Sequence, residues 1–122
     1  MPDATYKDLK LFVPESLLSR LMDDRDLMLQ VLEACLPDLR NNLERFREQL
    51  AAGDVKEARR TVHSIKGSAQ NSDLRALAAL TLEIEDSLKE GDEGFARAKV
   101  GELADVIENT IREIQGYFPE LG

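Results

Sequence analysis

The sequence predicts an all-α fold, an antiparallel four-helix bundle with a short additional N-terminal helix. The 122 residues are rich in Leu, Ala, Glu and Arg, which favour helix. Aromatic residues make up only 5% and Trp is absent, which argues against an aromatic-rich β domain. Apolar residues also recur every three or four positions between a few Gly and Pro residues. We therefore expect a single domain over residues 1–122, with a bundle over about 24–117.

The first two predicted helices follow an N-terminal arm over residues 1–13. Pro14 suits the first position of a short helix over about 14–22. Asp23 or Asp24 can cap a second helix that reaches about Ala52. The apolar positions expected to face the core in that helix are Leu27, Val31, Cys35, Leu39, Leu43, Phe46 and Leu50. Pro37 lies inside this run, so we expect it to kink or briefly break the helix.

The remaining helices are separated by short turns. Gly53 can end the second helix in a left-handed conformation, and Asp54 can cap a third helix over 55–71. Ser72 or Asp73 can cap a fourth helix over about 74–90. Residues 91–94, Gly-Asp-Glu-Gly, predict a turn before a last helix over about 95–117. Four substantial helices joined in this way pack most simply as an antiparallel bundle.

Composition and charge exclude several classes of function. The formal net charge is -8, from 16 Lys and Arg against 24 Asp and Glu, which argues against a nucleic-acid partner. One Cys and one His exclude an intrachain disulfide and most metal sites. No apolar run reaches the roughly 18 residues of a membrane span, and the first ten residues are too polar for a secretory signal. We expect a cytoplasmic, monomeric domain with no membrane contact and no metal.

The third predicted helix carries the candidate site. Its apolar residues fall on one stripe, which should face the core, and its other side is basic around the only histidine. The stripe consists of Val55, Ala58, Val62, Ile65 and Ala69, and the basic side of Lys56, Arg59, Arg60, His63, Lys66, Gly67 and Gln70. Residues 55–75 hold five basic and two acidic side chains, a net charge of +3, so the rest of the chain carries -11. Such a patch would attract an acidic partner or an anionic group.

Two glycines and the cysteine need separate interpretations. Gly67 lies one turn after His63 inside a helix, where Gly costs roughly 1 kcal/mol relative to Ala. It lies far from the core stripe, so open space beside the imidazole explains it better than a close contact between helices. For Gly101 in the last helix, close packing is the simplest interpretation. Cys35 lies on the apolar stripe of the second helix and is expected to be a buried structural thiol.

The residues from His63 to Ala69, His-Ser-Ile-Lys-Gly-Ser-Ala, favour reversible phosphorylation of a histidine nitrogen. An exposed imidazole is a good nucleophile near neutral pH. Lys66, one turn along, could neutralise an oxyanion on that ring. No second histidine can act as the base for a serine nucleophile, so hydrolysis is less favoured.

At this point the chain resembles a known family. The pattern His-x-x-Lys-Gly-Ser on the second long helix of a four-helix bundle is similar to that of a histidine phosphotransfer (HPt) domain, over nearly the whole chain. The turn at 50–54 and the Pro in the preceding helix also resemble the family. The resemblance implies that His63 is the phosphoacceptor through Nε2, that Lys66 steadies the phosphoryl group and that Gly67 keeps the site open. Supporting residues would be Arg59, Arg60, Ser68 and Gln70.

Two features near the motif bear on this resemblance. Many members have an apolar residue and a Gly nine and ten positions after the His, where this chain has Ser72 and Asp73. This difference could alter the turn into the fourth helix or place a carboxylate near one end of the site. Glu85 lies 22 residues after His63, where chemotaxis kinases have a Glu that bonds the imidazole. It could fix the tautomer, although Glu83 and Asp86 are alternatives and a solvated acid is an equally simple interpretation.

The resemblance implies a phosphoryl carrier without kinase activity of its own. The chain lacks a Gly-rich phosphate loop and kinase motifs, so it should not use ATP. Its partners would be receiver domains of response regulators and of hybrid histidine kinases, and the receiver would supply Mg²⁺. Two other functions remain open, a non-catalytic helical adaptor for an acidic partner and the phosphoacceptor domain of a chemotaxis-type kinase.

Overall fold

The computed structural model describes residues 6–122 and is helical throughout its main elements. The four long helices are α2 (Arg25–Ala51), α3 (Val55–Asn71), α4 (Arg75–Lys89) and α6 (Val100–Tyr117). Two shorter α-helices are present, α1 (Pro14–Arg20) and α5 (Glu93–Ala98). Single 3-10 turns lie at either end, η1 (Tyr6–Asp8) and η2 (Pro119–Leu121). The predicted all-α bundle with a short extra N-terminal helix is therefore confirmed.

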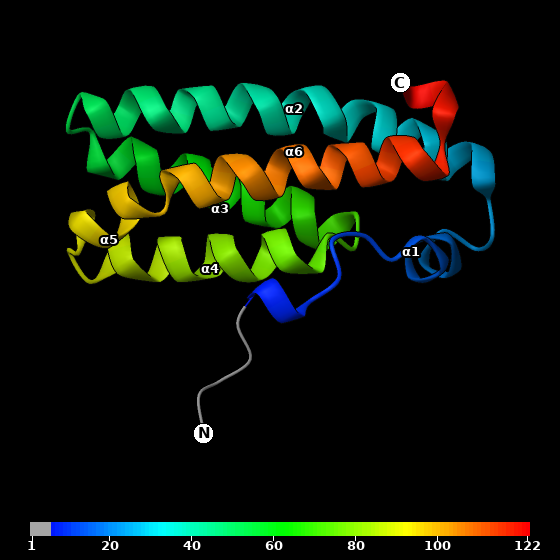
Figure 1. Cartoon of the computed structure of the whole chain (residues 1–122), viewed down its shortest axis with the longest axis horizontal. Helices are drawn as coiled ribbons and strands as arrows, with labels where there is room; N and C mark the ends of the chain where they lie inside the picture. The colour runs from blue at the N-terminus through cyan, green and yellow to red at the C-terminus, as the bar shows by residue number, and fades with distance from the viewer. Residues whose placement is uncertain (1–5) are drawn as a thin grey trace.

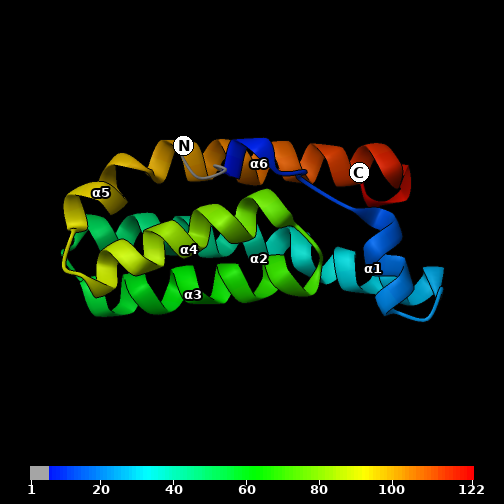
Figure 2. The same cartoon turned by 90° about the horizontal axis from the view of Figure 1, so that it is seen from below.

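The four long helices run antiparallel to their neighbours in the chain (Figure 1). The two views together place α3 and α6 on opposite sides of the bundle, with α2 and α4 between them (Figure 2). Helix α3 packs against α2 and α4, and α6 packs against the same two helices. One face of α3 is consequently left free of any other long helix.

A single cluster of buried apolar side chains fills the space between the helices. It runs from Tyr6 to Phe118 and includes Phe46, Leu77, Ile107 and residues of every long helix. Burial of each such side chain contributes on the order of 1.5–3 kcal/mol to the free energy of folding. The outward face of α3 therefore rests on a well-packed support.

The second helix differs from its prediction in two respects. It runs unbroken through Pro37, whose side chain is exposed, so the expected break is absent. Its first turns extend past the end of α3 and lie beside α1 (Figure 2). The core stripe there is shifted by one residue, so Leu27 is 40% exposed and Val31 only half-buried. Their places in the core are taken by Met28, Leu32 and Leu36.

The last predicted helix is divided in the structure. The Asp92 carboxylate accepts a hydrogen bond from Phe95 N at 3.0 Å and starts α5 at Glu93, inside the segment predicted to be a turn. The helix stops at Lys99 and resumes as α6. Gly101 is exposed, and a Cβ there would have no atom within 4 Å, so the close-packing interpretation of this residue was wrong.

Neither predicted cap of the fourth helix is used. The N-cap residue of α4 is Leu74, which has no side-chain cap, while Ser72 is buried. Asp73 adopts a left-handed backbone with φ of 55°, a conformation that Gly adopts more readily than other residues. Its carboxylate lies 3.0 Å from the guanidinium of Arg20 on α1, and this ion pair neutralises its charge.

The N-terminal arm replaces that missing cap. The carbonyl oxygen of Lys10 accepts a hydrogen bond from Ala76 N, in the first turn of α4, at 3.0 Å. Farther back, Tyr6 is buried and its hydroxyl lies 2.5 Å from Glu102 of α6. Burial and this bond raise the pKa of Tyr6 to about 12. The arm therefore ties α4 to α6; its first five residues lie outside the described part of the chain.

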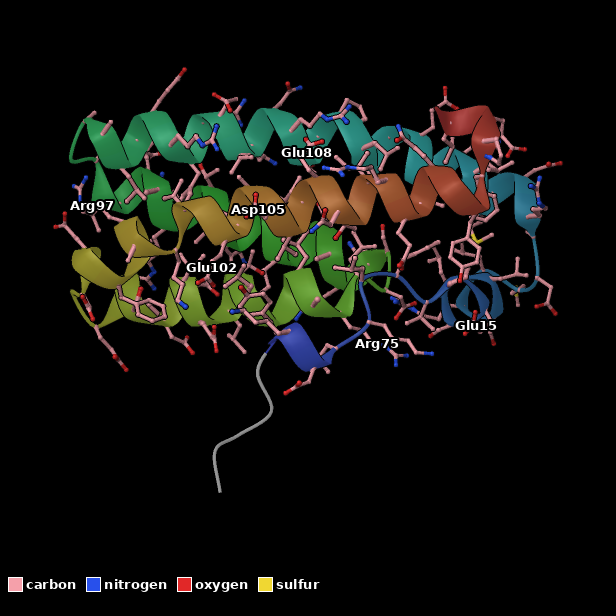
Figure 3. The ribbon with its side chains drawn as sticks, in the orientation of Figure 1. Glu15, Arg75, Arg97, Glu102, Asp105 and Glu108 are labelled. Carbon is pink, nitrogen blue, oxygen red and sulfur yellow. The ribbon has the colours of Figure 1, made fainter. Side chains whose placement is uncertain are left out.

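Acidic side chains gather on the side of the bundle opposite α3. Glu102, Asp105 and Glu108 follow one another at three-residue spacing along α6 (Figure 3). Glu108 pairs with Arg40 of α2 at 3.2 Å. Part of the excess negative charge inferred from the sequence is thus located on α6, away from the basic side of α3. No helix in residues 6–122 is long and apolar enough to cross a membrane.

Candidate functional site

The outward face of α3 presents the histidine. Asp54 accepts a hydrogen bond from Glu57 N at 3.3 Å and starts the helix where the sequence predicted. Its inner face buries Ala58, Val62, Ile65 and Ala69, as expected from their spacing. His63 lies on the other side of the helix, where its side chain is 65% exposed.

The imidazole is held by a buried carboxylate from the neighbouring helix. His63 Nδ1 lies 2.6 Å from Oε2 of Glu85 on α4, and Lys66 Nζ lies 2.5 Å from Oε1 of the same group. The Glu85 side chain is only 3% exposed, which makes the pair of contacts a fixed part of the packing. The structure therefore selects Glu85 over Glu83 and Asp86, which are exposed.

The charge state of Glu85 follows from these contacts. Burial alone would raise the pKa of its carboxyl group, but the hydrogen bonds from Lys66 and His63 outweigh burial and hold that pKa below its ordinary value. Glu85 is thus a carboxylate at neutral pH, which can only accept a hydrogen bond, so Nδ1 of His63 is the donor in this contact. In the neutral form of the ring, the free lone pair is then on Nε2, and the ring is exposed.

Gly67 leaves the space near this ring open. A Cβ built on Gly67 would meet no atom within 4 Å, so packing within the domain does not require glycine there. Helical side chains lean toward the N-terminus of their helix, and one at residue 67 would lean toward His63 one turn earlier. The absence of a side chain therefore keeps the approach to the imidazole clear.

A basic hollow of about 610 Å³ opens between α3 and α4 on the N-terminal side of His63. Seven residues line it: Lys56, Arg59, Arg60, His63, Ser64, Glu85 and Lys89. Arg60 is held by Glu57 at 2.9 Å, and Glu85 is neutralised as described above. The hollow is therefore positively charged and borders the imidazole directly.

The predicted supporting residues fall into two groups. Arg59 and Arg60 line the hollow beside His63, as their helical spacing suggested. Ser68 instead faces α2, where its hydroxyl lies 3.4 Å from Asp38. Gln70 is exposed near α1, and its backbone carbonyl accepts a bond from Arg20 at 2.9 Å. The structure does not bring these last two residues to the imidazole.

Sequence reasoning missed Lys89. It lies four residues after Glu85 on α4, so both side chains face the same side of that helix. Once Glu85 is placed against His63, this spacing puts Lys89 at the hollow. Cys35 is buried, and burial raises the pKa of its thiol, which fits a structural role. Among residues 6–122 no group of three His, Cys, Asp or Glu side chains could hold a metal ion.

This helical bundle presents one exposed imidazole, and a buried carboxylate fixes the orientation of that ring. These are features of a domain that carries a covalently attached group on a histidine. Comparison with protein families gives the same class: the sequence model of the Hpt domain matches residues 30–115, more than half of the chain. The chain belongs to the Hpt domain family, whose members take part in histidine phosphotransfer in phosphorelays. Searches of curated proteins and of solved structures found no match.

Proposed function

We propose that this chain carries a phosphoryl group on Nε2 of His63 between a sensor kinase, or its receiver domain, and the receiver domain of a response regulator. The contact between His63 Nδ1 and Glu85 supports this assignment most directly. It fixes the ring orientation and places the lone pair of the neutral ring on Nε2, on the exposed side. Lys66 acts in this proposal as the counter-ion that keeps Glu85 charged and in place.

Transfer from a receiver proceeds as an in-line displacement at phosphorus. The lone pair of Nε2 forms the new P–N bond while the bond from phosphorus to the aspartyl oxygen breaks, and the receiver recovers its carboxylate. The ring keeps the Nδ1 proton and becomes positively charged. Glu85, 2.6 Å from Nδ1, lies where it stabilises that charge as it develops.

The receiver supplies the remaining chemistry in this proposal. Its acidic residues would hold Mg²⁺, and that ion would neutralise the phosphoryl oxygens in transit, whereas this chain contributes no cofactor and does not use ATP. A basic hollow beside His63 complements such an acidic partner. The chain thus acts as a phosphoryl carrier rather than as a kinase.

A second surface of α2 and α3 suits contact with the receiver. Leu27, Val31 and Ala34 form an outward row on α2 at spacings of four and three residues, and none of them is buried. A shallow groove beside this row is lined by Val31, Ala34 and Cys35 together with Ser68 of α3. Apolar contact here would place a receiver over the C-terminal end of α3, where Ser68 lies five residues after His63, and over the first turns of α2.

Phosphotransfer from phosphorylated receivers of the source organism tests the proposal. We expect the wild-type chain to gain a label that is lost in acid and retained in base, as a phosphorus–nitrogen bond on histidine requires. Because the chain contains one histidine, such a label identifies the residue. If no cognate receiver or kinase transfers such a label, the domain is a non-catalytic adaptor and the proposal is wrong.

The phosphoacceptor domain of a chemotaxis-type kinase is a second candidate. The Glu85 contact favours it, because a Glu at this position resembles the one that bonds the imidazole in those kinases. The phosphodonor separates the two functions. Labelling by ATP with an isolated kinase catalytic domain, but by no phosphorylated receiver, would select this candidate.

Replacing Gly67 with Leu should slow transfer from the receiver without unfolding the bundle. The new side chain would lean toward His63 and obstruct the approach of the partner. We expect the transfer rate to fall at least tenfold, equivalent to about 1.4 kcal/mol in the barrier. Thermal unfolding followed by circular dichroism should show equal or greater stability, since Gly costs roughly 1 kcal/mol in a helix.

Gly101→Leu provides the matched control for this variant. Gly101 is also helical with no atom within 4 Å of a Cβ, but it lies on α6. It should gain similar helix stability and transfer at the wild-type rate. A wild-type rate in Gly67→Leu as well would contradict the proposed role of Gly67.

A further inference from the structure

Lys66 is already engaged in the structure, although the family resemblance assigns it to the phosphoryl group. Its Nζ lies 2.5 Å from Glu85 Oε1, and its side chain is only 15% exposed. It does not line the hollow that His63 borders. A phosphoryl dianion on Nε2 therefore needs counter-charges from other residues.

Three cations around the hollow are free to supply them. Lys56, Arg59 and Lys89 line it and form no ion pair within residues 6–122. The fourth cation, Arg60, is shared with Glu57 in an exposed pair. Glu85, the one acid that lines the hollow, is neutralised by Lys66 and His63. The residues that line the hollow therefore leave it with a net positive charge.

The direction of the imidazole connects it with these cations. Helical side chains lean toward the N-terminus, so the ring of His63 lies over the turn that contains Arg59. Helix α4 runs antiparallel to α3, and Lys89 follows Glu85 by one turn toward the same end (Figure 1). The three cations consequently surround the open space on the N-terminal side of the ring.

We infer that the hollow is the binding site for the phosphoryl group on His63, with Arg59 as its principal counter-ion and Lys56 and Lys89 as outer cations. The inference rests on the proposed phosphorylation of His63. Arg59 is one turn from the histidine, and a guanidinium can donate two parallel N–H bonds to phosphoryl oxygens. Lys66 then acts only through Glu85.

Phosphoramidate provides a test that needs no partner protein. Nε2 attacks its phosphorus, the P–N bond of the reagent breaks and ammonia leaves, so His63 acquires the same phosphoryl group. The second ionisation of this group is then followed by ³¹P NMR over a pH series. A nearby cation favours the dianion, so its removal should move the titration midpoint to higher pH.

Arg59→Gln is compared with Lys66→Gln and with Arg112→Gln, in which the lost cation lies on α6. We expect the midpoint to rise by about half a pH unit in Arg59→Gln, to rise less in Lys66→Gln and to stay unchanged in Arg112→Gln. Lys66→Gln could unfold, and in that case the comparison of Arg59→Gln with Arg112→Gln decides.

The possible results separate the inference from the proposed function. Equal midpoints in Arg59→Gln and Arg112→Gln, or a larger rise in Lys66→Gln, would overturn the assignment of Arg59 and leave His63 as the phosphoacceptor. A wild-type chain that gains no phosphoryl group on His63 would overturn both.

Discussion

His63→Gln should take no label from a phosphorylated receiver that labels the wild-type chain. Gln offers no nucleophilic ring nitrogen, and the chain has no second histidine to replace it. The effect should therefore be a complete loss rather than a slower rate. Quantifying base-stable label on the protein over a time course measures it directly.

The same variant should remain folded. The His63 side chain is 65% exposed, and Gln can donate an N–H to Glu85 in place of Nδ1. We expect the free energy of unfolding to change by about 0.5 kcal/mol or less. Base-stable label retained in His63→Gln would show that the phosphoryl group resides elsewhere.

Replacing Glu85 with Ala should affect both stability and transfer. The variant leaves Lys66, which is 15% exposed, without its carboxylate, and an uncompensated buried charge is costly. We expect a loss of about 2–4 kcal/mol in the free energy of unfolding, measured by urea denaturation. Transfer should slow by roughly 10–100-fold because the ring loses the group that fixes its orientation and tautomer.

A matched substitution distinguishes this effect from a general loss of acidic charge. Asp86 is adjacent to Glu85 on α4 but is exposed. Asp86→Ala should change the free energy of unfolding by about 0.5 kcal/mol or less and leave transfer unchanged. Equal effects of the two variants would contradict the role given to Glu85.

The pH dependence of stability follows from the direction of the Glu85 shift. Its pKa is lower in the folded chain than in the unfolded chain, because the bonds from Lys66 and His63 outweigh burial. The resulting stability is fully present above the ordinary glutamate value and is lost as the pH falls through the folded value. The difference in unfolding free energy between wild type and Glu85→Gln should therefore be constant near neutral pH and shrink in acid.

Much of the fold could be predicted because its determinants are local. The spacing of Val62, Ile65 and Ala69 fixed the inner face of α3, and Asp54 marked its start. The exposure of His63 followed from the same periodicity. In the first turns of α2 the spacing of apolar residues predicted the wrong core positions. These turns extend beyond the end of α3 and pack against α1, so Met28 rather than Leu27 faces the core.

The site could be predicted only in part because its contacts join distant residues. The sequence suggested Glu85, but Glu83 and Asp86 fitted the same helix until packing placed one carboxylate against the imidazole. The engagement of Lys66 and the position of Lys89 depend on how α4 lies beside α3. The cap of α4 was missed for a similar reason, since it is a backbone carbonyl from the arm.

The hydrogen bond from Ala76 N to the carbonyl oxygen of Lys10 makes the N-terminal arm part of the folding unit. The family match begins at residue 30, well after the arm, yet Lys10 bonds to Ala76 and Tyr6 bonds to Glu102. Residues outside the matched range thus help to hold the helix that carries Glu85. Unfolding of the bundle should therefore be cooperative with unfolding of the arm. The segment that folds as one unit is accordingly longer than the segment that the family model matches.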